Sequence, residues 1–181
     1  MIAGIEDRHD GAINNVLMHF DKKKASLQAA PTIKSGRVNK TMQLTLKNNR
    51  EVTFRKFKEE DFPAIHSLNE KEEWNNLVSK RELTKEAWLD SGIAYVAESE
   101  GEIIGYIRGL TDQHITLFIC ELLIDQNFRG CGIGARLLDY VHTLYPSTRV
   151  EMLASSTSKT FYEQQSYRPF YGFRKTFEER H

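Results

Sequence analysis

Residues 124–136 read Ile124-Asp125-Gln126-Asn127-Phe128-Arg129-Gly130-Cys131-Gly132-Ile133-Gly134-Ala135-Arg136, and they constrain the architecture more than any other stretch. A nearly continuous apolar run, which predicts a central strand, ends at Ile124, and an amphipathic helical pattern begins at Ile133. The glycines at the junction permit positive φ angles and a close approach of the backbone to a ligand. The first helical turn adds unpaired N–H groups and the positive end of a dipole. This strand–turn–helix unit predicts a cradle for phosphate or pyrophosphate, with Arg129 adding charge at its rim.

The glycine spacing fits some phosphate-binding motifs and excludes others. The nucleoside triphosphatase loop GxxxxGK[ST] is absent. Gly130, Gly132 and Ala135 fit the dinucleotide fingerprint GxGxxA, and Glu151 follows at about the usual 20 residues. Against that interpretation, five residues separate Ile124 from Gly130, and the 46 residues after Ala135 are too few for the rest of a doubly wound sheet. A helix-capping turn that binds no ligand is a further alternative.

The periodicity around this turn predicts a mixed α/β domain rather than a pure βαβ alternation. We expect strands at residues 52–57, 93–97, 103–109, 115–124, 149–154 and 173–177. A tight turn at Glu100-Gly101 makes the second and third of these strands a hairpin. We expect helices at residues 59–68, 70–78, 84–89, 133–144 and 157–165, with Thr84 as the N-cap of the third.

Arg129-x-x-Gly132-x-Gly134 has the form [Q/R]-x-x-G-x-[G/A], follows a predicted strand and opens a helix. This closely resembles the pyrophosphate-binding signature of the GNAT superfamily of acyl-CoA-dependent N-acyltransferases. The resemblance covers about residues 51–181 and implies a mostly antiparallel sheet with splayed central strands, flanked by helices. It implies that acetyl-CoA pairs through its pantetheine arm with the strand residues Leu122, Leu123 and Ile124. It also implies that the diphosphate lies beside Arg129 on the amides of Gly130, Cys131, Gly132, Ile133, Gly134 and Ala135.

A second family motif, N-x-x-A-x-x-[FL]-Y followed by GF, is similar to residues 155–167. Phe161-Tyr162 matches it, whereas Ser155 stands where asparagine is usual and Ser166-Tyr167 replaces Gly-Phe. The resemblance implies that Tyr162 is the general acid for the departing CoA thiolate and that the Ser155 hydroxyl binds the cofactor. A phenol with an ordinary pKa of about 10 is protonated at pH 7 and can donate.

Two carboxylates are candidates for the base that deprotonates the amine. Glu151 lies on the predicted strand leading to Ser155, about where some family members have a catalytic glutamate. Glu121 lies within the apolar run, where a carboxylate must reach solvent, a partner or a ligand. Either residue could instead point outward at a sheet edge. No cluster has metal-ligand spacing, and the reaction implied by the resemblance needs no metal.

Composition excludes several other classes of protein. The 181 residues, 40% hydrophobic and 28% charged, suit one soluble domain, and no apolar run is long enough to span a membrane. Cys120 and Cys131 are too few for a disulfide framework or a four-ligand zinc site. The N-terminus has no secretory pattern, so we expect a cytoplasmic protein. The domain is not basic as a nucleic-acid binder would be.

Residues 1–50 differ from the rest, with nine basic and four acidic residues, against sixteen and twenty-one in residues 51–181. A helix over residues 12–20, a strand over 42–46 and a turn over 47–50 are expected here. We interpret residues 1–50 as an arm of uncertain role, either a docking or dimerisation element or a poorly ordered or non-native leader.

The sequence therefore predicts an acetyl-CoA-dependent N-acetyltransferase acting on a primary amine, by direct attack in a ternary complex. A small-molecule acceptor is preferred, and the elements expected to select it are the acidic residues 70–74 and the aromatic residues 167–171. The alternatives are a peptide or protein N-acetyltransferase and a non-catalytic CoA-binding sensor or interaction module. Neither nucleic acid nor membrane is expected as a partner, and a homodimer is left open.

Overall fold

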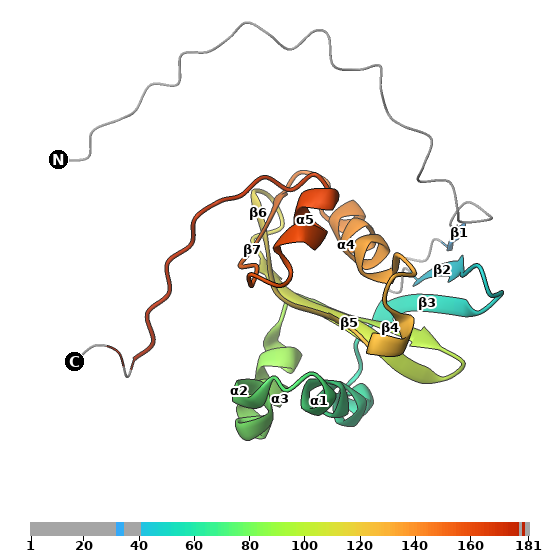
Figure 1. Ribbon diagram of the computed structural model, residues 1–181, viewed down its shortest axis with the longest axis horizontal. Helices are drawn as coiled ribbons and strands as arrows, with labels where there is room; N and C mark the ends of the chain where they lie inside the picture. Colours follow the sequence, from blue (N-terminus) through green and yellow to red (C-terminus); the bar gives the residue numbers. More distant parts are fainter. Residues whose placement is uncertain (1–31, 35–40, 178, 180–181) are drawn as a thin grey trace, which may run out of the picture.

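One twisted sheet organises the computed structural model, which describes residues 32–34, 41–177 and 179 (Figure 1). Its strands lie side by side in chain order. They are β1 (Thr32–Lys34), β2 (Thr41–Thr45), β3 (Glu51–Lys56), β4 (Ile93–Ser99), β5 (Glu102–Thr111), β6 (Thr116–Ile124) and β7 (Arg149–Met152). Neighbouring strands are antiparallel except β6 and β7, which are parallel. The predicted mixed, mostly antiparallel α/β architecture is confirmed.

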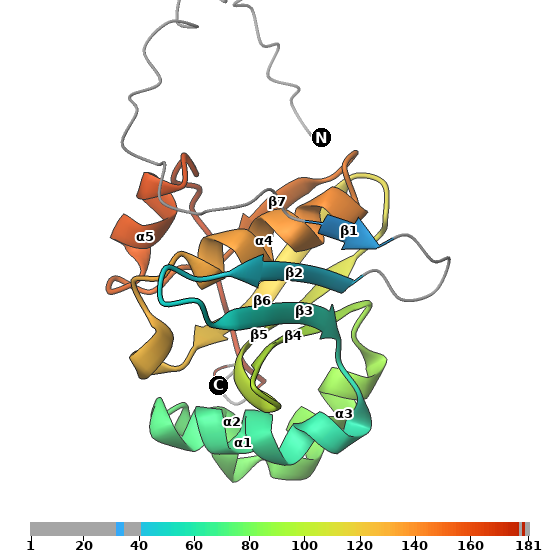
Figure 2. The same cartoon turned by 90° about the vertical axis from the view of Figure 1, so that its right-hand side faces the viewer.

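Helices cover the two faces of the sheet (Figures 1 and 2). One face carries the 3-10 turn η2 (Glu59–Asp61) and the helices α1 (Phe62–Lys71), α2 (Asn75–Ser79) and α3 (Arg81–Asp90). The other carries α4 (Ile133–Leu144) and α5 (Lys159–Gln164), and the turn η3 (Gln126–Phe128) follows β6. The predicted helix over residues 133–144 is confirmed, with its apolar residues Ile133, Leu137, Leu138 and Val141 buried against the sheet.

The core has one layer on each side of the sheet because β5 and β6 present apolar residues to both faces. Leu117 and Ile119 of β6 pack with Ile107 of β5 in the cluster under α4. Leu123 of β6 packs with Tyr106 of β5 in the cluster under α1 and α3. A strand covered on both faces has apolar residues at successive positions, which explains most of the apolar run in β6, whereas Ile115 just before it is exposed.

The sheet extends across the boundary expected at residue 51. Strand β2 pairs with β3, and the side chains of Met42, Leu44 and Leu46 are buried in the core. The predicted strand over residues 42–46 and the turn after it are therefore part of the folded sheet. The helix expected over residues 12–20 lies outside the described residues.

Three local expectations are wrong. Thr84 does not cap a helix, because α3 already begins at Arg81 and the Thr84 hydroxyl donates to the Leu77 carbonyl at 2.9 Å. The helix expected over residues 70–78 is divided, because Glu73 adopts a left-handed φ of 59° between α1 and α2. Residues 173–177 form no strand, and the Phe173 side chain is 98% exposed. A strand needs a neighbouring edge to satisfy its backbone, and this segment pairs with no described strand.

A partly buried ion-pair network joins β3, β4 and the start of α1. Arg55 donates to both carboxylate oxygens of Asp61, at 2.7 and 2.8 Å, and to Glu98 at 2.6 Å. Asp61 also accepts the Lys58 backbone N–H at 2.8 Å. Burial raises the pKa of Asp61, but the hydrogen bonds from Arg55 and Lys58 outweigh burial, so the net pKa lies below the ordinary 3.8.

Asp61→Asn should lower the free energy of unfolding by about 2–3 kcal/mol at pH 7, because the largely buried Arg55 loses the carboxylate that accepts two of its hydrogen bonds and keeps only Glu98. A carboxyl whose folded pKa is depressed stabilises the fold above its unfolded pKa and loses that effect as the pH falls through its folded pKa. The difference from the native protein should therefore shrink below the ordinary pKa of 3.8. Urea unfolding on both sides of that pH measures this. Glu60→Gln, at an exposed neighbour, is the control, and a difference that does not change with pH would contradict the assignment.

Candidate active site

Strand β6 leaves its neighbour β7 halfway along its length. The parallel pairing joins Thr116–Ile119 to Arg149–Met152 and then stops, whereas β6 continues beside β5 to Ile124. The Asp125 N–H donates to the Ile104 carbonyl of β5 at 2.8 Å. By the alternation of an antiparallel ladder, Leu123 faces β5, and the backbone groups of Leu122 and Ile124 face the open side. Of the three residues predicted to pair with pantetheine, two thus present their backbone to the gap.

A bulge in β6 lies where the two strands part. Arg108 of β5 is opposite Glu121, and the next residue, Gly109, is opposite Ile119, which leaves Cys120 as the extra residue. Such a bulge bends its strand and increases the local twist. Glycine is required at position 109, because a Cβ there would lie 2.6 Å from the Phe118 carbonyl oxygen. The close approach of β5 at the bulge accompanies the divergence of β6 from β7.

The glycine turn forms an open cradle at the end of β6. Gly130 and Gly132 have φ angles of 75° and 78°, and apart from their own chain neighbours no atom of the described residues lies within 4 Å of the Cβ that either could carry. The first backbone bond of α4 runs from the Arg136 N–H to the Gly132 carbonyl at 3.1 Å. The amides of the first helical turn, those of Ile133, Gly134 and Ala135, therefore have no intrahelical partner. An anion with several acceptor oxygens fits this arrangement.

Gly134 is where the predicted site elements meet. A Cβ at this position would lie 3.5 Å from Phe161 of α5, 3.6 Å from Ile124 and 3.9 Å from Leu122. The cradle, the open edge of β6 and the helix that carries Tyr162 are therefore contiguous. A diphosphate matches the amides of the cradle and an extended amide-containing arm matches the open backbone edge, and CoA carries both groups.

Helix α5 presents Tyr162 and begins beside Ser155. The Tyr162 ring is half-buried and packs edge-on against Phe161 and Tyr167, with centroids 5.1 and 5.9 Å away. Burial raises the pKa of the Tyr162 phenol above its ordinary 10.0, so the phenol is neutral at pH 7. The Ser155 hydroxyl lies 2.9 Å from that of Thr157 and 3.0 Å from that of Ser158, and Ser155 also accepts the Ser158 N–H. Its hydroxyl organises the start of α5.

The two candidate bases have different environments. Both Glu121 oxygens are held by Arg108, which also donates to Ser91, and the Glu121–Arg108 pair is largely buried on the α3 side of the sheet. Glu151 lies on β7 opposite Phe118 and is more exposed. One of its oxygens pairs with Arg149 at 2.9 Å. Glu151 therefore keeps an oxygen that no described cation holds.

Sequence reasoning missed two partners of the predicted site residues. Arg108 was not identified as the partner of Glu121, although an arginine inside the apolar strand over 103–109 needs a counter-charge, and hairpin pairing could have found it. Glu72 was not identified as the partner of Arg129, which is 57 residues away. No local signal connects that pair, because helix packing alone brings them together.

Within the described residues, no helix is long and apolar enough to cross a membrane, and no three His, Cys, Asp or Glu residues are grouped to hold a metal ion. Cys120 is half-buried, and Cys131 is exposed within the cradle; both are free thiols.

Comparisons with known proteins identify the family. A family model described as the acetyltransferase (GNAT) domain matches residues 55–180. A GNAT family acetyltransferase from Streptococcus pneumoniae has 20% identity and a TM-score of 0.59, over 69% of this chain and 97% of that one. An aminoglycoside acetyltransferase from an uncultured soil sample, in complex with sisomicin, has 17% identity and a TM-score of 0.53, over 70% and 96%. Among curated proteins nothing matches.

The likeness to these two solved structures shows a shared fold. The family model covers well over half of the chain. GNAT proteins use acetyl-CoA as the acetyl donor, and the cradle and open edge described above fit that donor. The chain belongs to the GNAT family of acetyltransferases.

Proposed function

We propose that the protein transfers the acetyl group of acetyl-CoA to a primary amine by direct attack within a ternary complex. The observation that carries this proposal is the meeting of cradle, open strand edge and α5 at Gly134. In the reaction, the amine nitrogen bonds to the thioester carbonyl carbon and the C–S bond breaks. The amine loses a proton, and the CoA thiolate gains one.

The chain's own residues would hold the donor at these elements. The amides of residues 130–135, of which those of residues 133–135 have no intrahelical partner, suit the diphosphate, and the backbone groups of Leu122 and Ile124 suit the amides of pantetheine. A carbonyl held at the bulge of β6 would be polarised by a backbone N–H. Most of the rate enhancement would come from holding amine and thioester together.

Tyr162 is the proposed acid and Glu151 the proposed base. The half-buried phenol of Tyr162 is protonated at pH 7 and can reprotonate the thiolate. Glu151 is preferred to Glu121 because Arg108 holds both Glu121 oxygens, which suits a structural role. The Ser155 hydroxyl is proposed to act through α5, whose first turn it organises, and to contact the donor from there.

A small-molecule amine is the proposed acceptor, and the reducing cytoplasm the proposed location. The aminoglycoside acetyltransferase described above shares this fold and was solved in complex with sisomicin, and the described corner between α1 and α2 of this chain is acidic. A peptide or protein acceptor, or a CoA-binding module without turnover, would appear as other outcomes of the experiments below.

Replacing Gly132 by alanine should weaken acetyl-CoA binding about tenfold or more, because alanine disfavours the left-handed φ of 78° that aligns the converging amides. Isothermal titration with acetyl-CoA measures the change, with NAD as the comparison ligand. Gly101→Ala is the matched control: that glycine has a similar φ of 83° but lies in the β4–β5 turn. If the native protein binds NAD and not acetyl-CoA, or neither, the acyltransferase proposal is wrong.

Tyr162→Phe and Glu151→Gln should each lower kcat about a hundredfold, because each removes one proton-transfer group, and should change the KM of acetyl-CoA little. Because burial raises the Tyr162 pKa, the loss of native activity caused by deprotonation of this phenol should begin above the ordinary pKa of 10.0. Tyr162→Phe should lack this alkaline decrease in rate. Steady-state assays with polyamines, aminoglycosides and short peptides measure these effects.

Glu163→Gln, which affects an exposed residue of α5, is the control for these assays and should leave kcat unchanged. Acetylation of peptides alone would favour the protein-acceptor alternative. Tight acetyl-CoA binding with no turnover on any amine would favour the non-catalytic module. Full activity of the Tyr162→Phe variant would contradict the assignment of Tyr162 as the general acid.

We also propose a homodimer joined through residues 168–177. Phe170, Tyr171 and Phe173 are 83–98% exposed, and residues 167–177 carry three basic and no acidic side chains. Residues 51–166 carry twelve basic and nineteen acidic side chains, so a second copy offers a surface of opposite charge. In sedimentation velocity the native chain should be dimeric and Phe173→Ser monomeric, with the exposed Leu83→Ser as control. A monomeric native chain would contradict this proposal.

A further inference from the structure

Arg129 lies across the open edge of β6 in this structure. Its Nε donates to the Ile124 carbonyl oxygen at 2.8 Å, and one terminal nitrogen contacts the Glu72 carboxylate. Ile124 is one of the two residues whose backbone faces the side that β7 has left. Arg129 therefore occupies a backbone acceptor that the pantetheine arm needs under the proposed function.

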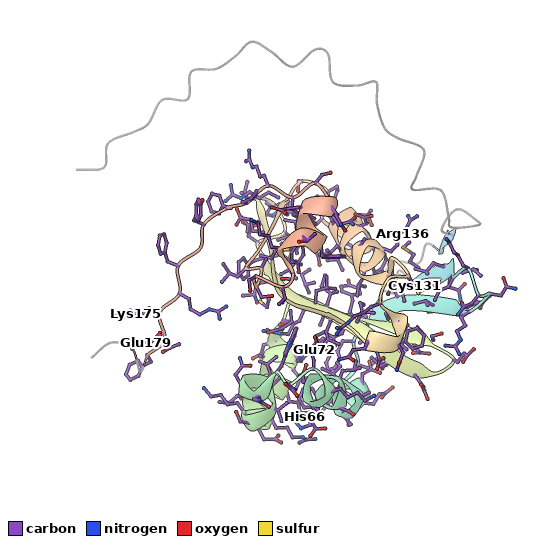
Figure 3. The ribbon with its side chains drawn as sticks, in the orientation of Figure 1. His66, Glu72, Cys131, Arg136, Lys175 and Glu179 are labelled. Atoms are coloured by element: carbon purple, nitrogen blue, oxygen red, sulfur yellow. The ribbon has the colours of Figure 1, made fainter. Side chains whose placement is uncertain are left out.

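Glu72 is held in place to make this contact. It follows α1 directly, and its N–H donates to the Leu68 carbonyl at 3.1 Å. Glu73, next in the chain, turns the backbone away with its left-handed φ of 59°. Figure 3 shows Glu72 on the side of α1 that faces the sheet. A second, longer pair between Lys71 and Asp125, at 3.7 Å, joins the same two segments.

The Arg129–Glu72 pair is open to competition. Both side chains are partly exposed, and exposed ion pairs are weak because water and salt screen them. A diphosphate carries more negative charge than one carboxylate and offers several acceptor oxygens to a guanidinium. Arg129 directly precedes Gly130 of the cradle, so a diphosphate bound there is within reach of its side chain.

We infer that Glu72 is a latch that competes with acetyl-CoA for Arg129 and that, once released, binds the ammonium group of the acceptor. This inference rests on the proposed function. When Arg129 turns to the diphosphate, the Ile124 carbonyl becomes available to pantetheine, and Glu72 loses its cation. A partly buried carboxylate without a counter-charge attracts a protonated amine. Glu72 thus weakens donor binding, strengthens acceptor binding and favours entry of the donor first.

The donor half of the inference is tested by titrating acetyl-CoA into Glu72→Gln. This variant should bind acetyl-CoA roughly three- to fivefold more tightly, the range of an exposed ion pair, and the gain should shrink at high salt. Glu73→Gln is the matched control, because Glu73 is adjacent and exposed and makes no ion pair with a described residue. In a protein that already carries Arg129→Gln, adding Glu72→Gln should not change the affinity for acetyl-CoA, because Glu72 affects donor binding through Arg129.

The acceptor half is tested with whichever amine the native protein acetylates fastest in the panel above. Glu72→Gln should raise the KM of that amine about tenfold and leave kcat within twofold. Unchanged or weaker acetyl-CoA binding by Glu72→Gln, or an effect that persists with Arg129→Gln, would overturn the latch. An unchanged amine KM would overturn the acceptor role. Failure of the native protein itself to bind acetyl-CoA would instead refute the proposed function.

Discussion

The site depends on a backbone constraint in the middle of the sheet. Strand β6 is paired on both sides only as far as Ile119, and beyond the bulge no strand among the described residues lies beside its outward-facing groups at Leu122 and Ile124. Unpaired backbone groups are costly unless water, a side chain or a ligand satisfies them. In this structure the Arg129 side chain satisfies one of them, at Ile124. The site is therefore an interrupted ladder that a ligand rich in amides can complete.

The exposure of four arginine–carboxylate pairs distinguishes those that stabilise the fold from those that can exchange partners with a ligand. Arg55 with Asp61 and Arg108 with Glu121 are largely buried, so breaking either leaves an uncompensated charge inside the protein. Arg129 with Glu72 and Arg149 with Glu151 are more exposed, and the first of these pairs borders the glycine cradle. Only such exposed pairs can be exchanged for substrate groups at low cost.

Much of the fold could be predicted because its signals are local. The helix over residues 133–144 has a complete apolar stripe, and the hairpin turn at Glu100-Gly101 has the left-handed angles that such turns require, 54° and 83°. The strand expected over residues 173–177 was wrong because alternation alone cannot supply a neighbouring edge. The prediction that Thr84 caps a helix was wrong because its hydroxyl donates instead to the Leu77 carbonyl of the preceding helix α2.

The sequence by itself determined the order of most elements, the glycine cradle and the family, because periodicity and backbone permissiveness are properties of a few consecutive residues. Only the tertiary structure decided which charges meet. Glu121 became a structural partner of Arg108 through the register of β5 and β6, and Glu72 reached Arg129 across 57 residues. Ion pairing depends on distance and burial in space, and the packing of α1 against the sheet sets both.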